Sequence, residues 1–113
     1  MVRKRNVPDR GDLVWLNFSP QSGHEQAGRR PALVISRKQY NKPSGLALIC
    51  SITTKEKGYP FEVVLPRKGP VTGVVLADQV RCLDWSTRKI EYISRVDDSV
   101  VAEVTARIQA LIQ

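Results

Sequence analysis

The chain has 113 residues, a length typical of one domain that buries its own core. Its apolar fraction of 42% excludes a largely disordered chain, and no apolar run is long enough to span a bilayer. The net charge is +7, and the basic start at residues 1–6 lacks the apolar stretch of a secretory signal. We expect one cytoplasmic domain over residues 1–113, whose residues 1–6 need not be ordered.

Short β-rich segments separated by turn residues fill most of the chain. A turn at Asp9-Arg-Gly11 precedes the first of them, and another turn is expected at residues 41–45. The loop at residues 19–29 is longer than a hairpin needs, and such loops often carry function. The composition predicts strands at residues 12–18, 30–36, 46–54, 61–65, 74–77 and 79–83.

The end of the chain changes its period. From residue 97 to residue 113, Val101, Val104, Ile108 and Leu111 recur at spacings of three and four, which predicts an amphipathic helix. The carboxylate of Asp97 or Asp98 is expected to cap its first turn. The fold class is therefore mainly β with a C-terminal helix: a strongly curved antiparallel, barrel-like sheet on which the helix packs.

Strand alternation sorts the polar residues of the second strand. Pro31, Leu33 and Ile35 form the bulkier face and are expected in the core. Arg30 therefore points outward or into a groove, and Arg29 points the opposite way.

The third strand offers a hydroxyl at its end. Thr53 shares its face with Ser51, which makes that face the more polar one, so we expect Thr53 rather than Thr54 in a groove. The pattern alone is also that of an ordinary β-branched strand residue.

The excess of 18 basic over 11 acidic residues bears on partners. Nucleic acid is the first candidate, because phosphate contacts dominate affinity for it, and an acidic protein is the second. A basic surface without a partner is the third interpretation. The basic residues are spread along the chain, which favours a groove assembled by folding over a basic tail.

Cysteine and histidine are too few for a metal centre. The chain has Cys50, Cys82 and one histidine, His24, so no metal-ligand spacing exists, and we expect no cofactor. Both thiols are expected to be reduced and buried. A thiol nucleophile would need a histidine partner, and nothing in the sequence places His24 beside either sulfur.

Four segments resemble the MazF toxins of bacterial toxin–antitoxin pairs. They are PDRGDL at residues 8–13, GHEQAGRRPALVIS at 23–36, TTKEKGYPFEV at 53–63 and ADQV at 77–80. The resemblance runs in the same order from about residue 7 to the C-terminus. It implies an SH3-like barrel, a homodimer, and a metal-independent endoribonuclease that cuts single-stranded RNA within a short sequence. It also implies an acidic antitoxin whose flexible tail blocks the toxin.

The resemblance implies three catalytic residues. They are Arg30 before the proline of the second strand, Thr53 at the end of the third strand, and Glu25 in the loop that precedes Arg30. In the implied reaction the RNA 2′-hydroxyl attacks the neighbouring phosphorus and leaves a 2′,3′-cyclic phosphate and a 5′-hydroxyl. A guanidinium matches phosphate oxygens and is a poor base, so Arg30 is expected to stabilise charge. Thr53 is expected to donate a hydrogen bond, and Glu25 is the candidate general base.

Further residues are candidates for RNA binding. Gln26, Asp78 and Gln79 are expected to contact base edges, and Lys55, Lys57 and Arg81 to contact phosphates. Many relatives carry a small polar residue at the position of His24, so we interpret His24 as a loop or RNA-contacting residue rather than a proton-transfer group. Trp15 and Trp85 could stack on bases, although tryptophan in a strand is more often core.

Two other functions compete with the nuclease. Related barrels of the same toxin superfamily poison DNA gyrase by binding it, and they would not need Glu25, Arg30 and Thr53. A plain RNA-binding barrel would bind RNA with the same salt dependence and cut nothing. Basic charge does not distinguish the three, and the resemblance favours the nuclease.

Overall fold

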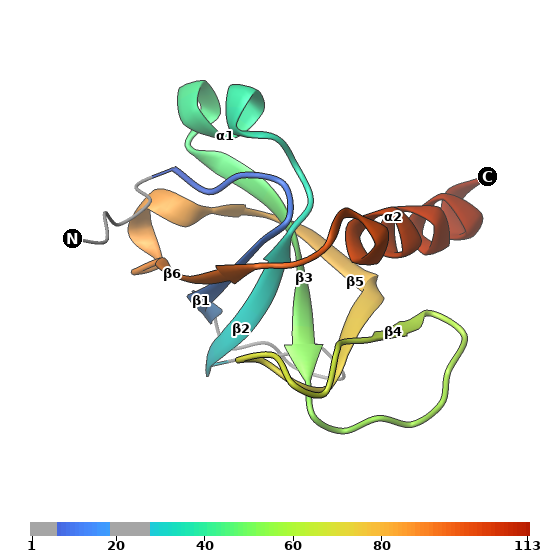
Figure 1. The fold of residues 1–113 in the computed structure, drawn as a ribbon. Coiled ribbons are helices and arrows are strands. Elements are labelled where there is room, and N and C mark those ends of the chain that lie inside the picture. Colours follow the sequence, from blue (N-terminus) through green and yellow to red (C-terminus); the bar gives the residue numbers. More distant parts are fainter. Residues whose placement is uncertain (1–6, 19–27) are drawn as a thin grey trace.

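The computed structural model describes residues 7–18 and 28–113, which form a single six-stranded antiparallel sheet with the strand order β4-β5-β3-β2-β1-β6 (Figure 1). The strands are β1 (Asp12–Phe18), β2 (Gly28–Val34), β3 (Leu46–Thr53), β4 (Glu62–Val64), β5 (Val74–Asp84) and β6 (Glu91–Arg95). The helices are α1 (Lys38–Ser44), the 3-10 turn η1 (Trp85–Thr87) and α2 (Asp98–Ile112).

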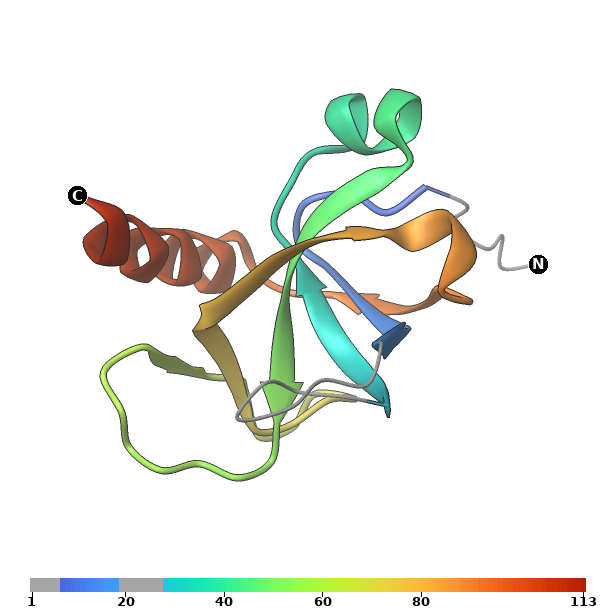
Figure 2. The ribbon, with the colours of Figure 1, turned by 180° about the vertical axis from the view of Figure 1, so that it is seen from behind.

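The sheet is strongly curled but open. Its edge strands β4 and β6 do not pair with each other, while α2 lies along one side of the curl (Figures 1 and 2). The predicted fold class is therefore confirmed as a mainly β chain with a C-terminal helix, and the sheet takes the form of a half-barrel. Burial of apolar area on both sides of this sheet is the main stabilising contribution.

Two hydrophobic clusters occupy the two sides of the sheet. The first joins Leu33, Cys50 and Ile52 to Val101 and Val104 of α2. The second cluster consists of Val14, Leu16, Phe18, Ala32, Val34, Ala47, Ile49 and Leu83. Strands that are buried on both faces lack the clean alternation of a half-solvated sheet.

The single core face that we expected for the second strand is therefore wrong. Leu33 lies in the first cluster as predicted, but Ala32 and Val34, on the opposite face, are equally buried in the second. The strand also begins at Gly28 instead of residue 30. Arg30, half-buried, lies at the end of this doubly buried strand, opposite Leu16 of β1.

The long strand β5 changes its register midway. Cys50 of β3 pairs with Val80, but Ile52 pairs with Val75, so an extra stretch of β5 bulges where Asp78 and Gln79 lie. The break that we predicted at residue 78 marks this bulge, although the strand itself is continuous from Val74 to Asp84. Bulges re-aim side chains and are common beside functional sites.

Two elements differ from the prediction because tertiary contacts make them. The expected turn at residues 41–45 is the end of α1, which Gly45 terminates in a left-handed conformation. Asn41 anchors this helix: it is fully buried and donates to the carbonyls of Pro8 (2.8 Å) and Ser36 (3.0 Å). The strand β6, which the sequence analysis missed, pairs with β1 at the sheet edge.

The C-terminal helix begins one residue later than expected. Asp97 occupies the N-cap position, but its side chain makes no capping bond, so the expected carboxylate cap is wrong for Asp97. Val101 and Val104 are buried, while Leu111 and Ile112 are exposed where the helix extends past the sheet (Figure 1). None of the helices in the described ranges is long and apolar enough to cross a membrane.

The two cysteines are both free but differ in environment. Cys50 is buried, and this burial, with the charge of Asp78, raises the pKa of its thiol to about 12. Cys82 is exposed, so the expectation that both thiols are buried holds for Cys50 alone.

Candidate functional site

Arg30 and Thr53 line the same pocket at one end of the sheet. This pocket, called here the Arg30 pocket, has a volume of about 260 Å³. Its described lining is Trp15, Arg30, Pro31, Ile52, Thr53, Thr54, Pro70, Val71 and Thr72. It places a guanidinium and hydroxyl groups beside an aromatic ring, groups that suit a phosphate and a base, respectively.

Thr53 also borders a second pocket. This Asp78 pocket has a volume of about 370 Å³, and its described lining is Thr53, Lys55, Lys57, Tyr59, Phe61, Glu62, Leu76, Asp78 and Gln79. Four predicted RNA-binding residues thus lie together in it: Lys55, Lys57, Asp78 and Gln79. The two pockets share Thr53, so they form one continuous candidate site around the end of β3.

A tight turn fixes the backbone of Thr53. Gly73 precedes β5 with a φ of +111°, and a Cβ atom there would lie 2.3 Å from the Thr53 carbonyl oxygen. Real Cβ atoms do not approach so closely, and a positive φ also disfavours a side chain, so this position requires glycine. The turn at residues 70–72 that lines the Arg30 pocket is thereby packed against the strand that presents Thr53.

A buried carboxylate shapes the loop that carries the lysines. Glu62 is 8% exposed and accepts hydrogen bonds from the backbone amides of Gly58 (2.9 Å) and Lys57 (3.2 Å). The Lys55 amide in turn donates to the Thr53 hydroxyl oxygen (3.2 Å). The loop that presents Lys55 and Lys57 is therefore held at both its ends by side chain–backbone bonds.

Two aromatic residues of the Asp78 pocket were missed by the sequence analysis. The rings of Tyr59 and Phe61 stack with centroids 5.2 Å apart, and Tyr59 is 50% exposed. Phe61 is partly buried against the first hydrophobic cluster, so it supports the exposed Tyr59 ring, on which a nucleobase can stack. The sequence pattern did not mark these two residues as part of a site, because their spacing of two is that of an ordinary strand. Their loop lies beside Asp78 only through long-range contacts.

The environment perturbs Asp78. Desolvation raises the pKa of the Asp78 carboxyl; a hydrogen bond from its own backbone amide lowers it by less, and the charge of Glu62 adds a still smaller rise. Asp78 is nevertheless an exposed residue that lines the pocket. A carboxylate whose charge is disfavoured in the free protein gains from hydrogen-bond donors such as base amino groups.

Arg81 lies outside the described lining of both pockets. Its guanidinium carbon is 5.3 Å from the centroid of the Phe18 ring, a cation–π arrangement. The structure thus does not bring Arg81 together with Lys55 and Lys57. Glu25, Gln26 and His24 fall within residues 19–27 and lie outside the described residues.

The two tryptophans have different surroundings. Trp85 packs against the second hydrophobic cluster and donates from its ring nitrogen to the Asn41 carbonyl (3.0 Å). Trp15 is 37% exposed and lines the Arg30 pocket. Of the two candidates for base stacking, Trp15 has the position for it and Trp85 is structural.

The neighbouring Arg29 has a different role from Arg30. Its guanidinium donates to the Asn17 side chain (2.9 Å), the Lys89 carbonyl (3.0 Å) and Glu91 (3.1 Å). These bonds tie β2 and β1 to β6 at the sheet edge. The Arg29 guanidinium therefore bonds to neighbouring strands and has a structural role, whereas Arg30 borders the pocket.

Comparison with known proteins places the chain in a family. Residues 9–112 match the family described as PemK-like, MazF-like toxin of type II toxin–antitoxin system. The chain therefore belongs to this toxin family, and the family resemblance predicted from the sequence is confirmed.

Individual relatives are similar over nearly their whole length. The endoribonuclease toxin MazF of Escherichia coli K12 is 45% identical over 108 residues, covering 96% of each chain. The endoribonuclease toxin ChpB of the same organism is 41% identical over 118 residues, covering 100% of each chain.

The fold is shared with solved structures. The crystal structure of MazF from Deinococcus radiodurans has a TM-score of 0.90 and 54% identity, covering 94% of this chain and 96% of that one. A MazE–MazF crystal structure from the same organism has a TM-score of 0.85 at the same identity and coverage.

Proposed function

We propose that the chain is the toxin of a toxin–antitoxin pair and acts as a sequence-specific, metal-independent endoribonuclease on single-stranded RNA. The scissile phosphate would lie in the Arg30 pocket, and the flanking bases would lie in the Asp78 pocket. The observation that carries this proposal is that one residue, Thr53, borders both a guanidinium and a set of base-reading and cationic side chains. The activity named for the relatives supports the same conclusion.

The proposed chemistry uses the 2′-hydroxyl of the RNA as nucleophile. Its oxygen bonds to phosphorus while the bond to the 5′-oxygen breaks, which leaves a 2′,3′-cyclic phosphate and a free 5′-hydroxyl. The 2′-hydroxyl proton passes to a base, for which Glu25 is the candidate, and the departing 5′-oxygen takes up a proton. Arg30 stabilises the charge on the non-bridging oxygens, and Thr53 donates a hydrogen bond to one of them.

Recognition would divide between three kinds of group. Asp78 and Gln79 on the β5 bulge, with Gln26 and His24, would contact base edges, and Lys55 and Lys57 would contact phosphates. Tyr59 and Trp15 would stack on unpaired bases. Arg81 stays a candidate phosphate contact for RNA that reaches beyond the two pockets.

The test is incubation of the purified protein with a defined single-stranded RNA in the presence of a chelator. We expect fragments that end in 2′,3′-cyclic phosphate and 5′-hydroxyl. Binding without cutting would favour the plain RNA-binding barrel. No RNA binding, together with inhibition of DNA gyrase, would favour the gyrase poison, and either result would overturn the nuclease.

Removal of the Thr53 hydroxyl tests whether this group takes part in the proposed cleavage. Thr53→Val keeps the β-branched shape and removes the donor, and we expect about a tenfold loss of kcat or more. Thr87→Val is the matched control, because Thr87 is an exposed residue of the same type that lies outside the described lining of the Arg30 and Asp78 pockets. Equal effects of the two substitutions would contradict the assignment of Thr53.

We also propose a homodimer that an acidic antitoxin neutralises in the cytoplasm. Tyr40 (46% exposed) and Leu48 (39% exposed) both adjoin Cys82: Leu48 pairs with it, and the Tyr40 hydroxyl lies 3.9 Å from its sulfur. An exposed apolar surface of this kind suits a subunit interface. Leu48→Lys should yield monomers by analytical ultracentrifugation, while the control Leu111→Lys at the exposed end of α2 should not.

The antitoxin proposal rests on charge and on relatives. A net charge of +7 suits an acidic partner, and MazF of Deinococcus radiodurans has been crystallised with MazE. Co-expression with an acidic candidate antitoxin should suppress RNA cutting. Unchanged cutting by a stable complex of the two proteins would contradict the inhibitory role.

A further inference from the structure

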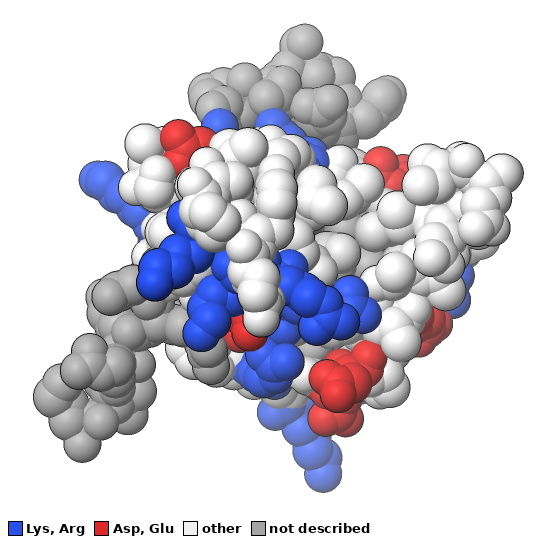
Figure 3. Space-filling view, turned by 90° about the horizontal axis from the view of Figure 1, so that it is seen from above, with Lys and Arg blue, Asp and Glu red and all other residues white. Residues whose placement is uncertain are grey.

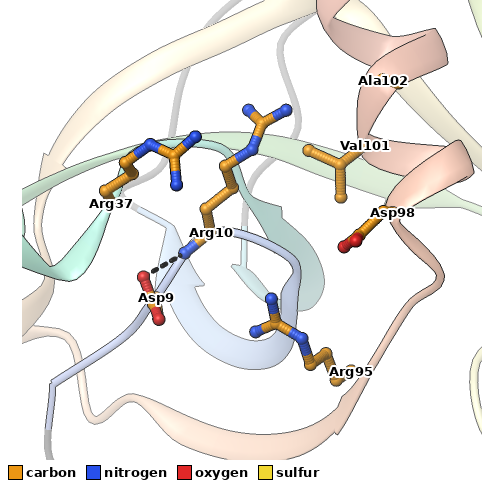
Figure 4. Close-up of a pocket in the computed structure, with 7 residues that line it drawn as sticks. All are labelled: Asp9, Arg10, Arg37, Arg95, Asp98, Val101 and Ala102. Carbon is orange, nitrogen blue, oxygen red and sulfur yellow. Dashed lines mark hydrogen bonds between the residues drawn. The ribbon is translucent and has the colours of Figure 1, made fainter.

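A second concave site lies away from the Arg30 and Asp78 pockets, between α1 and the start of α2. Called here the Arg37 pocket, it has a volume of about 380 Å³. Its described lining is Asp9, Arg10, Arg37, Arg95, Asp98, Val101 and Ala102 (Figure 4). We propose that it binds a phosphate group of the RNA strand outside the cleavage motif, an inference that rests on the proposed function.

Two of its arginines form no ion pair with any residue in the described part of the chain. Among the described residues, neither Arg10 nor Arg37 forms an ion pair, and Arg10 makes only two long contacts, to the Ile35 carbonyl (3.5 Å) and the Thr105 hydroxyl (3.4 Å). Arg37 makes no side-chain hydrogen bond within the described part of the chain. Adjacent guanidinium groups repel each other, so a bound anion lowers the energy of this arrangement.

The two acidic groups of the pocket do not neutralise the charges of Arg10 and Arg37. The Asp9 carboxylate already accepts bonds from the backbone amides of Arg10 and Lys38, both 2.9 Å. Partial burial works to raise the pKa of Asp9, but these two amides and the charge of Arg95 outweigh it and lower the pKa. Asp9 is therefore ionised and occupied by the backbone, and Asp98 is exposed on the first turn of α2.

The third arginine is held in place by the fold. Arg95 pairs with the fully buried Asp12 at 3.4 Å, yet its side chain is 46% exposed. A Cβ atom on Gly11 would lie 3.3 Å from the Arg95 guanidinium carbon, so the glycine leaves room for this group at the pocket wall. A guanidinium fixed by one carboxylate still offers its remaining donors to an anion.

The surroundings favour a polyanion over a single carboxylate. Exposed Lys38 and Lys42 on α1 extend the positive charge beyond the pocket. In the view from above, Lys and Arg side chains gather near the middle of this face (Figure 3). A run of cations matches successive phosphates of one strand, and the forked guanidinium groups match phosphate oxygens.

The distance to the cleavage site sets which phosphate is bound. Arg10 contacts the carbonyl of Ile35, and Arg30 precedes Ile35 by five residues of extended chain, about 17 Å. The phosphate in the Arg37 pocket would thus lie several nucleotides from the scissile linkage. A short RNA that holds the cleavage motif alone would not reach it.

This difference in reach defines the test. We compare a short RNA limited to the motif with the same motif in long single-stranded flanks, using Arg37→Gln and the control Lys68→Gln. Both substitutions remove one exposed positive charge, and Lys68 lies outside the described lining of the Arg37 pocket. Arg37→Gln should raise KM for the long RNA about 3–10-fold and reduce its salt slope by about 0.7. Cleavage of the short RNA should not change.

Other outcomes are equally decisive. Equal effects of Arg37→Gln and Lys68→Gln on the long RNA would overturn the pocket, while continued cutting of the short RNA would leave the nuclease intact. Inorganic phosphate at constant ionic strength should abolish the long-RNA advantage of the unaltered protein. If poly-glutamate competes at this pocket more strongly than flanking RNA does, its occupant is an acidic peptide and the RNA assignment is wrong.

Discussion

The two ends of the central strands use similar polar side chains for opposite purposes. At the α1 end, Asp12 and Asn41 are fully buried and their hydrogen bonds are made inside the protein. At the Thr53 end, Lys55, Lys57 and Tyr59 are exposed around two pockets. A polar group whose hydrogen bonds are made inside the protein stabilises the fold. A polar group whose hydrogen bonds are not made there is available to bind a ligand.

The largest expected effect is on activity at the Thr53 end. Arg30→Ala removes the main stabiliser of developing phosphate charge and should lower kcat/KM by about 10²–10³-fold. The control is Arg29→Ala, which breaks an exposed ion pair with Glu91 that contributes about 1 kcal/mol or less. Single-turnover cleavage and thermal melting should show lost activity with little lost stability for Arg30→Ala alone. Comparable activity losses in both variants would contradict the division between the neighbours.

At the α1 end the expected effect is on stability. Asn41→Ala leaves the carbonyls of Pro8 and Ser36 and the Ser36 hydroxyl, which donates to Asn41 at 2.6 Å, without this partner. Loss of such buried bonds costs about 2–4 kcal/mol. Chemical denaturation measures this loss, and activity per folded molecule should be retained. A variant that is stable but inactive would reverse the roles of the two ends.

A smaller effect is expected where the fold touches the site. Gly73→Ala forces the Thr53 backbone to move and should lower kcat about tenfold with little change in KM. Gly45→Ala is the matched control, because it also has a positive φ but a Cβ there meets nothing within 4 Å. Both variants should lose about 1 kcal/mol or more of stability from backbone strain. An equal kcat in the two would show that Gly73 has a structural role only.

The smallest effect concerns pH. Because the folded protein holds the Asp78 pKa above its ordinary value, the folded state binds more protons, and stability falls as pH rises upward from about 4. Asp78→Asn should therefore raise Tm slightly at neutral pH and flatten this part of the pH profile, while weakening discrimination between RNA sequences. A lower Tm for Asp78→Asn at neutral pH would show that the ionised carboxylate stabilises the fold.

Local patterns predicted the strands that the core requires. The β-rich runs at residues 12–18 and 46–54 correspond to β1 and β3 within one residue, and the 3.6-residue period gave α2. The helix α1 carries no apolar period, and its stability comes from Asn41 contacts that join distant segments. The edge strand β6 is short and ends in charged residues, so its pairing with β1 left no local signal.

The site residues likewise divide into those that local sequence patterns predicted and those that only long-range contacts bring to the site. Arg30 and Thr53 followed from motifs near strand ends, where a residue's position in the fold is set locally. Tyr59 and Phe61 join the site because Glu62 holds their loop against β5, an arrangement that depends on hydrogen bonds to backbone amides. Ala32 and Val34 lie on the face of the second strand that was not expected in the core, and they are buried because the sheet curls and buries both of its faces.

The most direct test of the central claim is a crystal structure with an RNA that carries a 2′-deoxy group at the cleavage position and so cannot react. We predict that the scissile phosphate lies within hydrogen-bond distance of both the Arg30 guanidinium and the Thr53 hydroxyl. We also predict that flanking bases lie against Tyr59 and Asp78. A scissile phosphate bound away from Arg30 and Thr53 would contradict the account.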